Sequence, residues 1–152
     1  MRLLCDEMLT GIGRWLRAAG YDTAIAASGA SDADLLAQAS AEGRVLLTCD
    51  RGLAAQCTPG AVVLLSREGL DHAAAELRER LHIDWLHAPF SRCLVDNALL
   101  EEAPPAVLER LPERTRQAAG PITVCPACGR VYWPGSHVRR MRARLDRWRQ
   151  TT

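Results

Sequence analysis

Two short apolar runs most constrain the fold of this chain: 44–49, with the sequence RVLLTC, and 61–65, with the sequence AVVLL. A continuous apolar run of this length is typical of a strand in a sheet that helices cover on both faces. Residues 3–5 and 22–27 predict two further strands, and helical patterns separate all four. This β-α-β-α-β-α-β-α order predicts a mainly parallel sheet flanked by helices, with right-handed crossovers.

Helix boundary signals and a linker-like segment divide the chain into two parts. Ser31 and Asp34 resemble a capping box that opens a helix ending at Gly43. The region to about residue 88 is large enough to bury one core, and the segment that follows it reads as a linker. We therefore expect one domain at residues 1–88 and a smaller one at residues 89–152.

The composition excludes several kinds of chemistry. All 19 basic residues are arginine, so a P-loop, a Schiff-base lysine and the receiver-domain phosphorylation switch are excluded. The net charge of the whole chain, +1, does not favour any particular kind of partner. No apolar run approaches the roughly 20 residues of a membrane span, and residues 1–8 contain no signal-peptide core. We expect a soluble, cytoplasmic protein without a membrane partner.

Charge is distributed unevenly along the chain. Residues 1–129 carry 12 arginines and 17 acids, a net charge of −5, whereas residues 130–152 carry seven arginines and one acid, a net charge of +6. The basic tail interleaves its arginines with Met141 and Trp148. A solvated helix face and a nucleic-acid footprint both fit this pattern.

Acidic residues follow the predicted strands. Asp6 and Glu7 come directly after the first strand, Asp50 comes directly after RVLLTC, and Asp32 begins the helix after the second strand. The carboxyl ends of parallel strands meet at one edge of a sheet, where ligands bind. Clustered carboxylates repel one another unless a cation neutralises them, and oxygen ligands suit Mg²⁺ or Mn²⁺. The sequence therefore predicts a metal site that can activate a water and stabilise charge on a phosphate.

Each of these acids also has a structural interpretation. Asp32 could be a helix N-terminal acid that the macrodipole favours. Asp50 could cap the short helix at 51–56. Glu7 could face solvent or lie outside the first ligand shell. The occurrence of acids after two different strands at the same edge favours the metal site.

Two of the six cysteines have the spacing of metal ligands. Cys125 and Cys128, in the turn CPACG, have the knuckle spacing that lets two thiolates bind one tetrahedral Zn²⁺. Cys5, Cys49 and Cys57 lie in or beside apolar segments, where a thiol is more often a core residue. In a cytoplasmic protein, closely spaced cysteines favour metal binding over disulfides.

Five stretches carry the motifs of a known family, in order: 4–23, 31–36, 42–53, 90–93 and 125–141. The last stretch is the most specific, because a generic zinc ribbon would not share its Val-Tyr-Trp and Gly-Ser-His. Together they resemble the Mut-seven C-terminal RNase domain family. The resemblance spans nearly the whole chain and is weakest between about 98 and 120. It implies a PIN-like, three-layer α/β domain with a mainly parallel sheet, followed by a small zinc-ribbon domain.

The resemblance also implies an activity, which is metal-dependent endonucleolytic cleavage of RNA. The family's acidic residues correspond to Asp6, Asp32 and Asp50, the same three that the strand order selects. These would hold Mg²⁺ or Mn²⁺ as catalytic ligands. Arg51, beside Asp50, would help to hold the scissile phosphate.

Other residues are candidates for RNA contact. Trp133 could stack on a base, and the arginine-rich helix behind it, with Arg139 and Arg140, could track phosphates. A place in the small-domain core is the alternative for Trp133. Arg14 and Arg17 lie on the first helix and could contact RNA or the acidic cluster, with a plain surface position as the alternative.

The chain departs from the family at the second half of its zinc site. The family pattern places a cysteine pair at 93 and 96, but this chain has Cys93 and Asp96. Asp96 could serve as an oxygen ligand and complete a Cys₃Asp site with the later cysteine pair. Two alternatives stay open: His137 or His87 takes the fourth position, or the zinc is lost.

We therefore expect a metal-dependent ribonuclease with RNA as its partner. The alternative is a non-catalytic RNA- or ribosome-binding module whose acidic pocket is vestigial. A toxin paired with a protein inhibitor, by analogy with other PIN-like proteins, ranks below both. The ribosome or a second copy of the chain stays open as a further partner.

Overall fold

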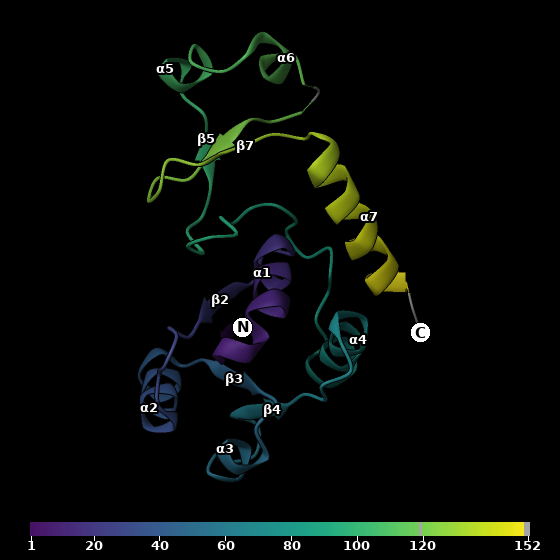
Figure 1. The fold of residues 1–152 in the computed structure, drawn as a ribbon. Helices are drawn as coiled ribbons and strands as arrows, with labels where there is room; N and C mark the ends of the chain where they lie inside the picture. Colours follow the sequence, from purple (N-terminus) through teal and green to yellow (C-terminus); the bar gives the residue numbers. More distant parts are fainter. Residues whose placement is uncertain (119, 151–152) are drawn as a thin grey trace.

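The computed structural model describes residues 1–118 and 120–150. Its first part is built on a four-stranded parallel sheet, and Figure 1 shows how helices surround it. The strands lie in the order β2-β1-β3-β4. Their bounds are β1 Arg2–Cys5, β2 Asp22–Ile25, β3 Val45–Thr48 and β4 Val62–Leu64. The helices between and after them are η1 Glu7–Leu9, α1 Thr10–Ala18, α2 Asp32–Glu42, α3 Arg51–Ala55 and α4 Leu70–Leu81. The predicted α/β architecture with a parallel sheet is confirmed.

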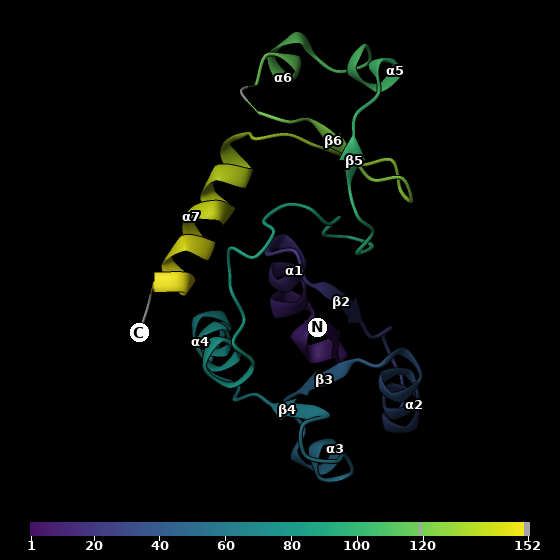
Figure 2. The same ribbon diagram turned by 180° about the vertical axis from the view of Figure 1, so that it is seen from behind.

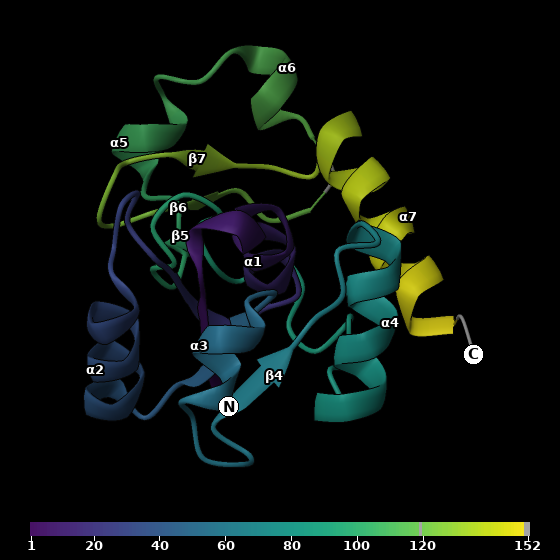
Figure 3. The same cartoon turned by 60° about the horizontal axis from the view of Figure 1, so that its bottom comes forward.

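The sheet is the middle of three layers (Figure 3). Alternate residues of a strand point to opposite faces, so neighbours on β1 enter different cores. Leu3 packs with residues of α1 and α4, whereas Leu4 packs with Leu35 of α2 and Leu53 of α3. Because both faces are covered, β3 and β4 are apolar along almost their whole length, as the two runs in the sequence predict.

The predicted helix boundaries of α2 are present. The Ser31 side chain accepts a hydrogen bond from Asp34 N at 3.1 Å, and the Asp34 side chain accepts one from Ser31 N, so the capping box is confirmed. Gly43 ends α2 in the left-handed conformation, with φ of 62°. This left-handed residue sets the direction in which the chain leaves α2 toward β3.

A second, antiparallel sheet of three short strands follows, in the order β5-β6-β7. Its strands are β5 Glu101–Glu102, β6 Thr123–Val124 and β7 Val131–Tyr132. The helices of this part are α5 Pro105–Leu108, α6 Glu113–Arg116 and the long α7 Ser136–Gln150. None of the helices in the described residues is long and apolar enough to cross a membrane.

Helix α7 lies alongside α4 of the first part (Figures 1 and 2). Trp148 is 5% exposed, and its ring contacts the rings of Trp15 and Trp85 at centroid distances of 5.0 and 4.8 Å. The Trp148 indole also donates to Asp71 at 2.8 Å. An interpretation of Trp148 as part of an RNA-binding stripe is therefore wrong, because the ring fills the core. The boundary at residue 88 stays a prediction, although one apolar core runs across it.

Arg17 is also buried rather than on the surface, with 7% exposure. Its guanidinium donates to the backbone oxygens of Thr23, Leu94 and Val95 at 2.8 to 3.0 Å. It is therefore unavailable to RNA or to the acidic edge, and the expectation that it could contact either is wrong. The interaction joins α1 and β2 to the loop that follows residue 93, because one guanidinium group donates to carbonyls of both segments.

Candidate active site and metal centre

Asp6 occupies the carboxyl end of β1, where its side chain is 9% exposed. One carboxylate oxygen, Oδ1, accepts from Met8 N at 3.0 Å and so caps η1. The other, Oδ2, accepts from the Thr48 hydroxyl at 2.6 Å. Among the described residues no arginine or histidine forms an ion pair with it. Asp6 is thus a largely buried carboxylate that only neutral hydrogen-bond donors contact.

Thr48 connects Asp6 to Asp50. Its hydroxyl donates to Asp6 and accepts from Asp50 N at 3.0 Å, so one side chain touches the residues that follow β1 and β3. Asp50 caps α3 through a hydrogen bond from Leu53 N to Oδ1 at 3.1 Å. The structure therefore places Asp6 and Asp50 at the same edge, as the strand order predicts. Thr48 is a component that sequence reasoning missed, although its position at the end of RVLLTC was a signal.

Asp32 and Glu7 lie on the β2 side of this edge. Asp32 is exposed in the first turn of α2, in keeping with its interpretation as a helix N-terminal acid. Glu7 accepts from Ser28 Oγ at 2.9 Å and from Gly29 N at 3.1 Å. These hydrogen bonds, the one from Gly29 above all, lower the pKa of Glu7. Glu7 therefore fastens the loop before α2 to the end of β1.

The acids do not form a closed metal cage. Among the described residues, one group of three or more histidine, cysteine or acidic side chains is close enough to hold a metal ion, and it lies elsewhere. Asp6, Asp32 and Asp50 are not drawn together to that extent. Two of the three are joined through Thr48, and the third stands apart at the start of α2.

A cavity of about 790 Å³ lies beside Asp50, which is one of its lining residues. The end of β3, the start of α3, the loop after β4 and one face of α4 form its walls. Arg51, predicted to hold a phosphate, lines this cavity beside Asp50. The cavity gives a charged ligand access to the edge of the sheet.

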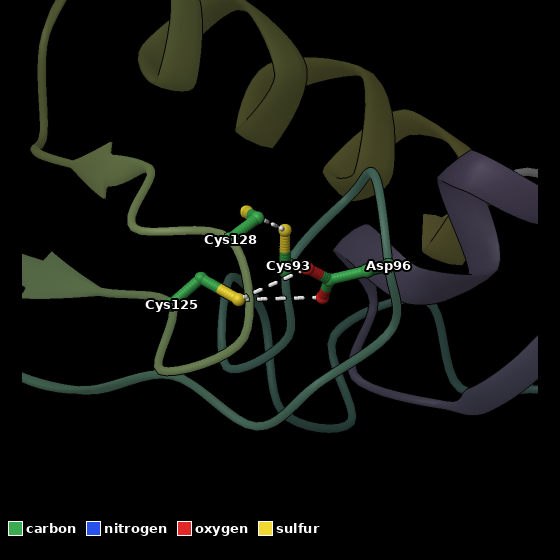
Figure 4. A group of neighbouring side chains, drawn as sticks. All are labelled: Cys93, Asp96, Cys125 and Cys128. Carbon is green, nitrogen blue, oxygen red and sulfur yellow. Dashed lines mark hydrogen bonds between the residues drawn. The ribbon is translucent and has the colours of Figure 1, made fainter.

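The metal-binding group is the predicted set Cys93, Asp96, Cys125 and Cys128, whose ligand atoms all lie within 4.8 Å of one another (Figure 4). Cys93 Sγ and Cys128 Sγ are 3.8 Å apart. Cys125 Sγ lies 3.2 and 3.3 Å from the two oxygens of Asp96. A tetrahedron with Zn–S bonds of about 2.3 Å has S···S edges of about 3.8 Å, so the spacing fits zinc.

The surroundings of two members of this cluster, Asp96 and Cys93, favour their charged forms. A hydrogen bond from Ala98 N, the largest influence, helps to hold the pKa of Asp96 down to about 2. Burial disfavours the thiolate of Cys93, but hydrogen bonds, with Tyr132 foremost, outweigh it and lower the pKa of that thiol. The Tyr132 hydroxyl lies 3.1 Å from Cys93 Sγ and also accepts from Leu94 N.

The structure distinguishes between the alternatives for the fourth ligand. Asp96 belongs to the cluster, whereas neither His87 nor His137 does. His87 instead stacks on Tyr21 with ring centroids 4.8 Å apart, and His137 is exposed at the start of α7. The proposal that a histidine completes the site is therefore wrong.

Apart from the buried Arg17, the predicted RNA-contact residues outside the acidic edge are accessible. Trp133 is 41% exposed and borders an apolar hollow of about 230 Å³ that Arg139 also lines. Arg140 is exposed on α7, and Arg14 is exposed on α1. The surface interpretation of Trp133 is therefore the one that its exposure allows.

Comparison with known proteins adds one finding. The family model of the Mut7-C RNAse domain matches residues 1–145 of the 152. No curated protein and no solved structure matches the chain.

Proposed function

The chain belongs to the Mut7-C RNAse domain family, and on that premise we propose that it is a metal-dependent ribonuclease that cleaves RNA endonucleolytically. The family indicates a nuclease with RNA as its substrate. The metal dependence, the position of the active site and the PIN-like character of the first domain are parts of this proposal.

The observation that carries the proposal is the burial of the Asp6 carboxylate without a cationic partner among the described residues. Burying an unpaired carboxylate is costly, and the cost falls when a cation or strong donors compensate it. Asp6 has Met8 N and Thr48 as its donors and forms no ion pair within the described residues. Asp50, held to the same threonine, supplies a second carboxylate at that edge. A hard divalent cation with oxygen ligands and bound waters fits this donor set.

In this mechanism Asp6 and Asp50 would hold the cation, and Asp32 would contribute a further carboxylate from the start of α2. When bound, Mg²⁺ or Mn²⁺ would supply an activated water and neutralise charge on the phosphate. Arg51 orients the scissile phosphate by charge-assisted hydrogen bonds. Thr48 keeps the two carboxylates in register by donating to one and accepting from the backbone of the other.

RNA contacts beyond the edge come from exposed residues. Arg139 and Arg140 on α7 neutralise phosphates, Trp133 stacks on an unpaired base, and Arg14 extends the basic surface on α1. These assignments rest on the exposure of all four side chains and on the net positive charge of the tail.

The cysteine cluster supports a structural zinc ion bound by Cys93, Asp96, Cys125 and Cys128. Replacing a thiolate by a carboxylate makes a site harder, which weakens its hold on zinc. We expect Asp96→Cys to raise zinc affinity by roughly 10-fold or more. Competition with a chromogenic chelator measures this. Glu109→Cys, which adds a thiol at an exposed position, should leave the affinity unchanged. An Asp96→Ala variant that binds zinc as tightly as the wild type would exclude Asp96 as a ligand.

The proposed activity is tested with the full-length protein, purified with zinc and assayed on a labelled single-stranded RNA. Internal cleavage should appear with Mg²⁺ or Mn²⁺ and disappear when these ions are withheld. If RNA binds well but no divalent metal supports cleavage, the activity assignment falls and the non-catalytic RNA-binding module takes its place.

A further inference from the structure

The cavity beside Asp50 contains more positive charge than the proposed mechanism uses. Three arginines line it, and these are Arg51, Arg67 and Arg80. Sequence reasoning singled out Arg51 alone, because Arg67 follows a different strand and lies 16 residues further along the chain.

Strand register explains why Arg51 and Arg67 meet at one cavity. Strands β3 and β4 are paired in parallel with Thr48 opposite Leu64. Asp50 and Arg51 follow β3 by two and three residues, and Ser66 and Arg67 follow β4 by the same numbers. The two loops contact each other, with Cys49 Sγ 3.9 Å from the Ser66 oxygen. The two arginines are therefore equivalent residues of neighbouring loops.

The other charged groups of the cavity already have partners. Arg80 donates to the Leu64 oxygen at 2.5 Å. Glu76 accepts from the backbone and hydroxyl of Ser66, and both Glu76 and Glu68 lie about 3 Å from His72 Nε2. These contacts hold the two glutamates on the α4 side of the cavity.

The guanidinium groups of Arg51 and Arg67, in contrast, form no hydrogen bond or ion pair with any part of the chain that the structure describes. Both are exposed. Burial, the main cause, and the nearby Asp6 raise the pKa of Cys49, and the positive charge of Arg67 opposes this rise. Arg67 therefore acts electrostatically on the loop that bears Asp50. Two unpaired guanidinium groups at the mouth of one cavity suit a ligand with repeated anionic groups.

We propose that Arg67 binds the phosphodiester group of the RNA strand adjacent to the scissile one, so that Arg51 and Arg67 hold two successive phosphates. The strand then runs from the acidic edge into the cavity between the ends of β3 and β4. This inference rests on the proposed function for the direction of the strand. Its core, a phosphate-binding pair of arginines, depends only on the cavity.

Binding of a fluorescein-labelled decauridylate to the full-length protein tests the inference, measured by anisotropy at several salt concentrations without added Mg²⁺ or Mn²⁺. We expect Arg67→Gln to weaken binding about 10-fold and to reduce the slope of log K against log salt by about 0.7, the value for one phosphate contact on a single strand. Arg67→Lys should keep most of the slope, because the charge remains. Arg114→Gln, which removes an exposed charge on α6, should change neither quantity.

The outcomes separate this inference from the proposed function. If the wild type cleaves RNA and Arg67→Gln has the wild-type affinity, salt slope and KM, the phosphate site is excluded and the nuclease stands. If the wild type binds RNA without cleaving it and Arg67→Gln binds about 10-fold more weakly, the phosphate site stands and the nuclease falls. A wild type that does not bind the oligonucleotide overturns the inference.

Discussion

Replacing Asp6 by asparagine is expected to lower the rate of RNA cleavage about 100-fold or more, because a catalytic cation supplies several kcal/mol of transition-state stabilisation. The substitution preserves the size of the side chain and the acceptor for Met8 N, and it removes the negative charge. The measurement is kcat with Mg²⁺ or Mn²⁺ on single-stranded RNA. Asp50→Asn should have an effect of similar size, because it removes the second carboxylate of the same site.

Two comparisons make the Asp6 result specific. Glu109→Gln neutralises an exposed acid whose side chain forms no hydrogen bond or ion pair within the described residues, and it should retain wild-type activity. Thermal unfolding of Asp6→Asn should differ little from that of the wild type, because the loss of the hydrogen bond from Thr48 to the carboxylate, about 1.5–3 kcal/mol, is offset by the removal of a buried charge. An Asp6→Asn enzyme with undiminished activity would exclude the acidic edge as the site of chemistry.

Replacing Trp148 by alanine is expected to lower the free energy of unfolding by about 3–5 kcal/mol, the usual cost of emptying a buried tryptophan site. The indole packs against Trp15 and Trp85 and donates to Asp71, so its loss leaves a cavity where α7 meets the first part of the chain. Because typical domains are stable by about 5–15 kcal/mol, this is a large fraction of the total. Urea unfolding followed by circular dichroism measures it.

Trp133→Ala is the matched control, because it removes the same side chain from a 41% exposed position. It should cost under about 1 kcal/mol of stability, as surface substitutions usually do. Equal small losses for the two variants would contradict the packing of α7 into the core. RNA affinity should respond in the opposite order, with Trp133→Ala weakening binding more than Trp148→Ala does when both are folded.

Most of the first part of the fold is predictable because its signals are local. The runs RVLLTC and AVVLL identify β3 and β4, and the capping box marks the start of α2. The acids at the ends of β1 and β3 follow from parallel topology alone, since consecutive crossovers bring those ends to one edge. The positions of these strands, of the helix start and of the acids can therefore be read from residues that are neighbours in the sequence.

The residues that the sequence misassigned depend on distant partners. Arg17 has the charge of a surface residue, and two of the three carbonyls that satisfy it when buried, those of Leu94 and Val95, lie far along the chain. Trp148 lies among arginines, a pattern that a nucleic-acid footprint and a solvated helix face fit equally well. Its spacing with Met141 and Leu145, at seven and three residues, was nevertheless a signal for one apolar helix face. Arg67 was missed because no local pattern relates the loop after β4 to Asp50.

The cysteine cluster is predictable from the sequence only in part. The spacing of Cys125 and Cys128 is a local signal, and the departure at position 96 was visible in the sequence. Which side chain takes the fourth position depends on the loop that Arg17 and Asn97 fasten to β2. Asn97 accepts from Thr23 N at 3.0 Å and donates to Asp22 at 2.7 Å, and both bonds set the position of Asp96.

The most direct test of the acidic edge is the binding of Mn²⁺, followed by the paramagnetic resonance signal of the free ion in titrations of zinc-loaded protein. We expect the wild type to bind Mn²⁺ and both Asp6→Asn and Asp50→Asn to lose that binding, with zinc content unchanged and Glu109→Gln binding as the wild type does. Retention of wild-type Mn²⁺ binding by both aspartate variants would contradict the account, because the two carboxylates would then not hold the cation.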